Sequence, residues 1–225
     1  IKLASDSVLP HVRSDIKHYL QQGSNNIVNL ETDFFMKIHK NLYGRISAGM
    51  FEEMFGGVGA EVLYRTFDSR YAISAEWNRV RKRTFDQRLD FFQYEVDTGH
   101  IGIFYEEPVY NVLFNLRIAR YLAGDKGATL EISRLFDSGI RMGAWATLTD
   151  VPFAKFGEGS FDKGFYFQIP TDLFFQDYRT GNISFGLHPL TKDGGAILYG
   201  SNTLWGLLGN ADETGLLRDW RDIID

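Results

Sequence analysis

Two acidic residues, Glu31 and Asp33, are the first in the chain whose type and spacing could support chemistry. Residues two apart on a strand point to the same face, and a carboxylate pair can serve as acid and base in glycoside hydrolysis. Glu61 and Arg65 also share a face, and Glu76 lies opposite its apolar neighbours. Because carboxylates at this spacing are common on any wetted strand, we interpret these residues as a polar face whose charges compensate one another.

No other pattern indicates a nucleophile, a metal or a cofactor. The five histidines are scattered without the spacing of HExxH, and neither GxSxG nor a phosphate-binding loop occurs. The chain has no cysteine, which removes disulfides, thiolates and cysteine-type metal sites. We therefore expect no metal, no cofactor and no enzymatic activity, and a carboxylate-dependent glycan hydrolase is the least favoured alternative.

Two further features could bind a ligand. The chain has one basic cluster, made of Arg79, Arg81, Lys82 and Arg83. It could bind phosphate groups of lipid or lipopolysaccharide at a membrane rim, or it could be the solvated end of a hairpin. Trp145 shares a face with Arg141 and Thr147 and could stack on a sugar ring.

The elements that would position these side chains are strands. Apolar and polar residues alternate with period two over the stretches 30–39, 58–65, 71–78, 112–119, 128–133 and 141–148. Each stretch therefore has one apolar face and one mixed, more polar face. Turn-forming residues separate the stretches and indicate roughly a dozen strands, many of about 10 residues or more.

Strand length selects among the folds that such alternation allows. Soluble strands usually have about 5–6 residues, whereas strands that cross a membrane need about 9–11. The predicted fold is therefore all-β, an antiparallel transmembrane β-barrel or a large section of one. The alternative is a soluble β-sandwich that acts as a carbohydrate-binding module, because its strands alternate in the same way.

Composition sets the remaining limits. The 225 residues are 44% hydrophobic and 15% aromatic with a net charge of -5, which gives no electrostatic case for nucleic acid. No apolar run is long enough for a transmembrane helix. We expect one domain over residues 1–225, with a lead-in at 1–10, an irregular connector at 150–160 and a tail or short amphipathic helix at 212–225. The first residue, Ile1, suggests a processed or trimmed piece.

Several consecutive segments carry a resemblance to a known family. They are Gly127–Gly139, Arg141–Phe153 and Gly157–Gly164, preceded by Tyr121–Gly124. In this order they resemble the C-terminal part of the YjbH/GfcD-like family of exopolysaccharide or capsule proteins. The resemblance implies a porin-like barrel in the bacterial outer membrane, and a longer protein that is often a lipoprotein, of which this chain is the C-terminal portion. The implied partners are an exopolysaccharide chain, outer-membrane lipid and other proteins of the export system.

The expected function is a passive one, in which a wet lumen offers many weak hydrogen bonds to a sliding glycan. The candidate lumen residues are Glu31, Asp33, Lys37, Glu61, Arg65, Glu76, Asn78, Arg117, Glu131, Arg141 and Trp145. The apolar sides of the strands, such as Val112–Ile118, are expected to meet lipid. In the strand that follows the glycine-rich stretch 157–164, Phe165, Phe167 and Ile169 are predicted to face lipid, and Tyr166 and Gln168 to face the lumen.

Overall fold

The computed structural model describes residues 9–23, 25–136, 138–152, 161–171, 174, 182–189 and 191–209. Most of the expected lead-in, residues 153–160 of the connector and the expected tail at 212–225 lie outside the described residues. Among the described residues, no helix has the length and apolar character needed to cross a membrane.

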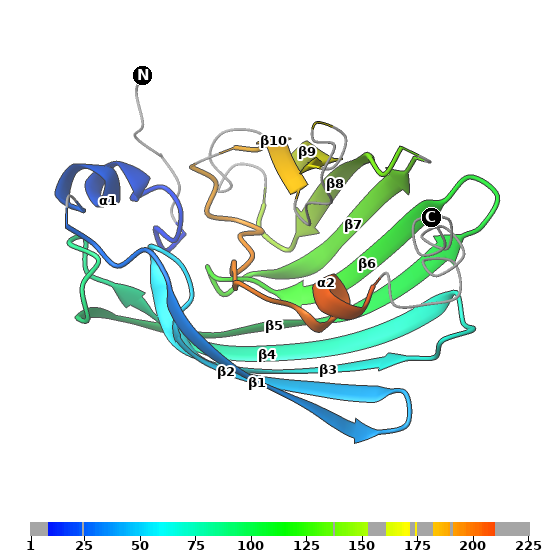
Figure 1. The fold of residues 1–225 in the computed structure, drawn as a ribbon. Coiled ribbons are helices and arrows are strands. Elements are labelled where there is room, and N and C mark those ends of the chain that lie inside the picture. Colours follow the sequence, from blue (N-terminus) through cyan, green and yellow to red (C-terminus); the bar gives the residue numbers. More distant parts are fainter. Residues whose placement is uncertain are drawn as a thin grey trace.

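The described chain is all-β, with ten strands and two short helices. The strands are β1 (Leu30–His39), β2 (Leu42–Met50), β3 (Phe55–Arg65), β4 (Tyr71–Arg83), β5 (Phe91–Glu107), β6 (Val112–Arg120), β7 (Lys126–Leu135), β8 (Arg141–Thr149), β9 (Asp162–Pro170) and β10 (Asn182–Leu187). The helices are α1 (Ile16–Gln22) and α2 (Leu204–Leu208). Figure 1 shows the strands curling as one trough around the segment that leads into α2.

All ten strands form a single antiparallel sheet in sequence order, from β1 to β10. This confirms the predicted all-β antiparallel class, with ten strands where the sequence indicated roughly a dozen. The sheet is open, because β1 and β10 are not paired with each other in the described part of the chain. The predicted barrel is therefore not confirmed, and the single layer also differs from the two stacked sheets of a sandwich.

Short turns hold the strands in register. Asn41 lies between β1 and β2 and Asn111 between β5 and β6, with φ angles of 66° and 53°. Asparagine tolerates this left-handed conformation better than most residues because its short polar side chain bonds locally. Each turn leads directly into paired strands, with Leu42 opposite His39 and Val112 opposite Glu107. The register then places residues of like character on the same face across the whole sheet.

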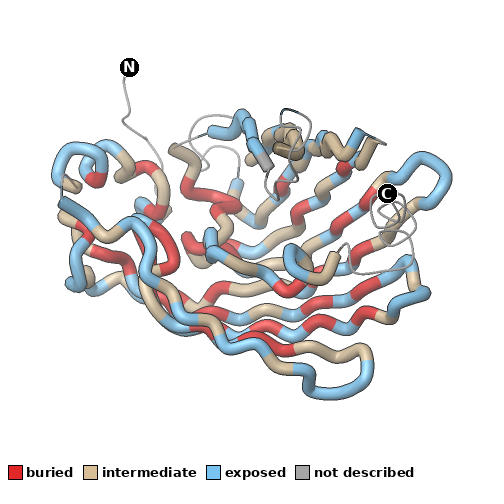
Figure 2. The backbone as a smooth tube through the Cα atoms, in the orientation of Figure 1, coloured by how far each residue is buried: buried red, intermediate tan, exposed pale blue. Residues whose placement is uncertain are grey.

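The two faces of the sheet differ sharply in exposure. On β6, Phe114, Leu116 and Ile118 are 36%, 38% and 58% exposed, whereas Leu113 and Asn115, which point to the other face, are 8% and 6% exposed. Figure 2 shows this alternation of buried and exposed residues along the neighbouring strands. Phe114, Leu116 and Ile118 therefore lie on the outer, convex face and are not sealed between two layers, as predicted from the alternation.

Hydrophobic clusters lie inside the trough. The larger cluster closes the end next to α1 and contains Val12, Tyr19, Phe51, Met54, Phe55, Val80, Val96, Leu122, Ala123 and Ala196. A smaller cluster joins α2 to the sheet through Leu63, Ala72, Phe104, Leu113 and Leu204. These clusters join segments that are far apart in sequence. Their burial therefore holds α1, α2 and the segment around Ala196 over the polar face of the sheet.

Candidate functional site

Residues 191–209, here called the inner strap, cross the concave face of the sheet (Figure 1). At the start of the strap, the Asp193 carboxylate accepts hydrogen bonds from the backbone N–H groups of Val12, Arg13 and Ser14 at 2.8–3.0 Å. Two residues further on, the Gly195 N–H donates to Asp125 at 2.8 Å. These bonds anchor the strap to both the N-terminal segment and the turn between β6 and β7.

The second half of the strap donates to acidic residues of the polar face. The Ser201 N–H donates to Glu31 at 2.9 Å, the Asn202 side-chain amide donates to Asp33 at 2.8 Å, and the Leu204 N–H donates to Glu61 at 3.0 Å. Three of the predicted lumen residues therefore bind the protein's own backbone or side chains. Glu31 and Asp33 share a face, as the spacing predicted, but they hold the strap.

One arginine that the sequence analysis did not single out organises the same acids. The Arg45 side chain on β2 is buried and lies within 4.0 Å of four carboxylates, at 3.5 Å from Glu31, 3.3 Å from Asp33, 3.0 Å from Glu61 and 3.7 Å from Glu76. A planar guanidinium suits this role because its donors point in several fixed directions. Arg45 was missed because β2 was not recognised as an alternating stretch, although Tyr43, Arg45 and Ser47 alternate with Leu42, Gly44 and Ile46.

Like Arg45, Glu131 on β7 lies at the centre of a cluster of polar contacts, and we call the two clusters the Arg45 hub and the Glu131 hub. Its carboxylate accepts hydrogen bonds from Asn115 at 3.4 Å, Arg117 at 3.3 Å and the Tyr166 phenol at 2.7 Å. Tyr166 lies on β9, so its ring must pass over β8 to reach β7. It does so at Gly143, where an added Cβ would lie 2.5 Å from the ring. Arg117 and Glu131 were predicted to share the polar face, while Tyr166 was predicted on that face without a specific role.

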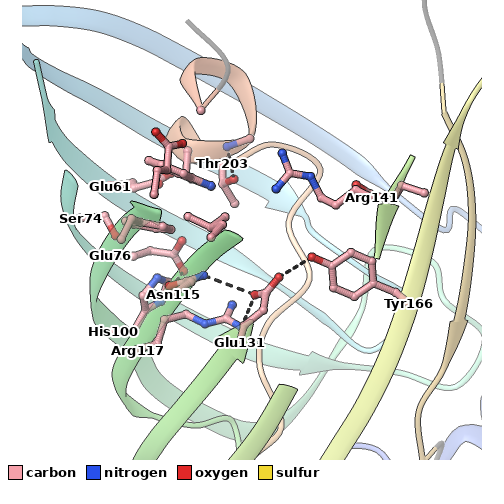
Figure 3. A pocket seen from close by; sticks show the side chains of 17 residues that line it. Glu61, Ser74, Glu76, His100, Asn115, Arg117, Glu131, Arg141, Tyr166 and Thr203 are labelled. Carbon is pink, nitrogen blue, oxygen red and sulfur yellow. Dashed lines mark hydrogen bonds and ion pairs between the residues drawn. The ribbon is translucent and has the colours of Figure 1, made fainter. Parts of the chain in front are cut away.

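The hubs and the strap enclose two cavities. One has a volume of about 400 Å³, lies between α2 and strands β3–β9, and is seen from close by in Figure 3. The other has a volume of about 570 Å³ and lies between the strap, the segment before α1 and strands β6–β9. Arg117, Glu131, Tyr166 and Thr203 line both cavities, so the two adjoin at the Glu131 hub. The lining is rich in hydrogen-bonding groups, which is the chemistry that polyhydroxylated ligands require.

The remaining candidates take different positions around these cavities. Arg65 pairs with Glu106 at 3.2 Å and lies over the Trp205 ring, and Asn78 donates to Glu76 at 2.6 Å. Lys37 is exposed near the end of β1. The two candidates at the far side of the sheet reach the cavities, because Arg141 lines the smaller one and Trp145 the larger one.

The structure divides the basic cluster among three environments. Arg79 and Arg81 lie outside the sheet, exposed and paired with Glu95. Lys82 points inward to Asp15, and Arg83 is fully buried. The Arg83 guanidinium donates to five backbone carbonyls, those of Ile27, Val28, Glu52, Gln87 and Arg88. The four residues therefore do not form one phosphate-binding patch.

Burial also shifts proton affinities where the strap is anchored. The pKa of Asp125 is raised above its usual value, mainly because burial penalises the charged carboxylate. One of its oxygens, Oδ1, is buried without a hydrogen-bond partner in the described structure, which fits a carboxyl group with a raised pKa. Burial likewise raises the pKa of Tyr199 on the strap. Among the described residues, no cluster of three or more potential metal ligands occurs.

The fold and site define a class of protein with an exposed apolar outer face and a hydrogen-bonding groove crossed by an internal strap. Residues 2–210 match the family described as "Exopolysaccharide biosynthesis protein YbjH", and the chain belongs to this family. It is 41% identical over 194 residues to the "Uncharacterized lipoprotein YjbH" of Escherichia coli (strain K12), and these residues cover 84% of this chain. They cover 28% of that relative, so the chain spans less than a third of its length. No solved structure matches the chain.

The family membership confirms the resemblance recognised in the sequence. It links the chain to exopolysaccharide biosynthesis through the family description. The relative's name describes it as a lipoprotein, which accords with the longer lipoproteins that the resemblance implied.

Proposed function

We propose that this chain forms a section of the wall of an outer-membrane β-barrel that takes part in exopolysaccharide secretion, without catalysing a reaction. The observation that carries the proposal is the convex face, where each of the ten described strands exposes large apolar side chains. An exposed apolar surface this continuous is atypical of a protein surrounded by water. It is what a membrane barrel presents to lipid.

The apolar surface has limits along the strands that match a bilayer. On β7, the outward residues Ala128, Leu130 and Ile132 lie between the outward charges Lys126 and Arg134. The two charges lie eight residue steps apart, which corresponds to about 27 Å of strand at about 3.4 Å per residue. The apolar band of an outer-membrane barrel is about 25 Å tall. On β5, Asp97 and Glu107 bracket the outward residues Ile101, Ile103 and Tyr105 over a longer span of ten residue steps, or about 34 Å.

Aromatic residues mark one rim of this band. On the outer face, the rings of Tyr71 and Tyr105 stack with centroids 4.8 Å apart, and Tyr105 and Phe114 follow at 6.2 Å. These residues lie close to strand ends on β4, β5 and β6. Aromatic side chains with a polar tip gather at membrane–water interfaces, so the row supports an interfacial girdle.

The proposal places a requirement on the two sheet edges. In hydrocarbon, unpaired backbone N–H and C=O groups cost several kcal/mol each, so an open edge cannot face lipid. β1 and β10 must therefore pair in the membrane, either with each other or with strands beyond this chain. Because the chain corresponds to only 28% of its relative, further strands in a longer protein are a direct source of such partners.

The groove would supply the contact with glycan. Its polar residues offer both charge signs, hydroxyls and amides, which suits many weak hydrogen bonds to a polymer that moves past. The inner strap occupies part of the groove, so passage would follow the cavities beside it. The partners of this role are an exopolysaccharide chain, outer-membrane lipid and other proteins of the export system.

The experiment compares the chain in detergent, in lipid vesicles and in plain buffer. We expect it to float with vesicles and to migrate faster on a gel when it is not boiled, because folded membrane barrels resist unfolding by the gel detergent. A monodisperse chain in buffer that does not associate with vesicles would overturn the membrane assignment. In cells from which the gene that encodes this chain is deleted, restoring the gene should restore secreted exopolysaccharide, and unchanged secretion after the deletion would overturn the export assignment.

A further inference from the structure

The smaller cavity, here called the chamber, contains groups whose bonding is incomplete. Asn115 lines the chamber and is 6% exposed, and its Oδ1 atom is buried without a donor in the described structure. The Nε atom of Arg117, another lining residue, is likewise buried without an acceptor. Buried polar atoms are normally hydrogen-bonded, so an unpaired acceptor in a cavity indicates a place where a ligand donor can bind.

Arg141 differs from the other arginines of the groove. Arg45, Arg65 and Arg117 each have a carboxylate within 4.0 Å. Arg141 donates to the Ser133 hydroxyl at 3.3 Å. Among the described residues, no carboxylate lies within 4.0 Å of its guanidinium. Figure 3 shows its guanidinium pointing from β8 into the chamber. A planar guanidinium with free donors is well suited to a carboxylate.

The acids that line the chamber are already engaged. Glu131 accepts from three side chains, Glu61 binds Arg45 and the strap, and Glu106 binds Arg65. Glu76, the fourth acid of the lining, accepts from Asn78 and lies 3.7 Å from Arg45. Of the two arginines that line the chamber, Arg117 is held by Glu131, and Arg141 has no carboxylate partner among the described residues. A volume of about 400 Å³ is large enough for one or two sugar rings.

Trp205 on α2 lines the chamber, but its ring is already in contact with other protein side chains. One face of the Trp205 ring stacks on Phe104 with centroids 4.0 Å apart, and the Arg65 guanidinium lies 4.5 Å from the ring centre. These contacts fix α2 over the chamber. Selectivity must then come from hydrogen bonds and charge.

We propose that the chamber binds an acidic sugar of a glycan, with a carboxylate on Arg141 and a sugar hydroxyl donating to Asn115 Oδ1. This inference rests on the proposed contact with glycan and deepens it by naming a charged substrate class. The proposed function describes only many weak contacts along the lumen, whereas this inference adds one specific binding site for a sugar. Because the central contact is an ion pair, binding should weaken as salt is added.

The test measures binding of trigalacturonate and of neutral maltotriose to the full chain in detergent micelles, by calorimetry or ligand-observed NMR. We expect trigalacturonate to bind and maltotriose to bind at least about tenfold more weakly, since only trigalacturonate offers a carboxylate to Arg141 and a charge-assisted pair is stronger than a neutral hydrogen bond. Arg141→Gln should reduce trigalacturonate affinity by about tenfold or more, and Arg141→Lys by less. The matched control, Arg134→Gln, makes the same charge change on the outer face of the neighbouring strand and should leave affinity unchanged.

Equal affinity for the two trisaccharides, or equal loss in Arg141→Gln and Arg134→Gln, would overturn the inference. Circular dichroism of each variant separates loss of a contact from loss of the fold, and Asn115→Asp provides a second variant, because a negative charge there should repel the acidic ligand. If the chain inserts into vesicles but does not bind trigalacturonate, the subsite is wrong while the membrane assignment stands. If it binds trigalacturonate but does not insert, the subsite stands and the membrane assignment is wrong.

Discussion

The phenol of Tyr166 on β9 reaches Glu131 on β7 through a 2.7 Å hydrogen bond, although a whole strand lies between them. The ring passes over β8 at Gly143, the position paired with Tyr166 in the sheet. This arrangement connects three strands by one side chain and defines the boundary between the two cavities. The absence of a side chain at position 143 is therefore a structural requirement of the site.

Substitution of Gly143 tests this requirement. A Cβ at Gly143 would lie 2.5 Å from the Tyr166 ring, so Gly143→Ala should displace the ring and lower the free energy of unfolding by about 1–3 kcal/mol. The matched control is Gly186→Ala on β10, where a Cβ would meet its nearest neighbour at an ordinary 3.7 Å. Denaturant titration in micelles measures both variants. Equal stability of the two would contradict the packing described here.

The fully buried Arg83 should be far more important for stability than its exposed neighbour Arg81. Arg83→Met leaves five carbonyls without their shared donor and should cost at least about 3 kcal/mol of unfolding free energy. Arg81→Met removes an exposed ion pair at 3.8 Å and should cost about 1 kcal/mol or less. Denaturant midpoints of the two variants give the comparison, and similar midpoints would show that Arg83 is not the structural anchor.

The raised pKa of Asp125 predicts a specific dependence of stability on pH. A carboxyl group whose pKa is higher in the folded state binds its proton more tightly there, so it contributes stability below its ordinary pKa of 3.8. This contribution is lost as the pH rises through the raised folded-state pKa. Asp125→Asn keeps an oxygen for the Gly195 N–H and cannot ionise, so its advantage over the natural chain should grow as the pH rises. Unfolding free energies of both proteins over pH 3 to 8, at about one-unit steps, measure this difference. A constant difference would mean that Asp125 has an ordinary pKa.

Arginine substitutions on β6 distinguish lipid from water at the convex face. Leu116 lies in the middle of the outward row of β6, and Val112 lies at its end. In a bilayer, Leu116→Arg should cost about 2–4 kcal/mol and Val112→Arg about 0–1 kcal/mol, because the penalty falls from the midplane to the interface. Urea titration of folding into lipid vesicles measures both. A small and equal effect at the two positions would place this face in water.

The sequence predicted the faces of the strands better than their number. Val112, Phe114, Leu116 and Ile118 were assigned to one outward face, and they lie there, because the alternation of side chains is a local property of an extended backbone. β2 was not recognised, since its glycines and small residues weaken the apolar pattern. The described residues form ten strands where the sequence indicated roughly a dozen, while the antiparallel class is the one predicted.

The candidate site shows the same division between local and distant effects. That Glu31, Asp33 and Glu61 belong to the polar face could be predicted, because each belongs to a strand with clear alternation. Their convergence on Arg45 required the registers of three strands, which depend on turns and pairing. Their bonds to the strap join residues up to 170 positions apart. No periodicity encodes such contacts.

What the sequence determined by itself is thus the two-sided character of the sheet, with apolar residues on one side and charged residues on the other. The tertiary structure decided which polar residues remain available, because the strap, Arg45 and the contacts around Glu131 engage most of the acids and leave Asn115 and Arg141 incompletely bonded. The physical reason is that side-chain direction follows from the backbone within a few residues. Hydrogen-bond satisfaction, in contrast, depends on every segment that the fold brings together.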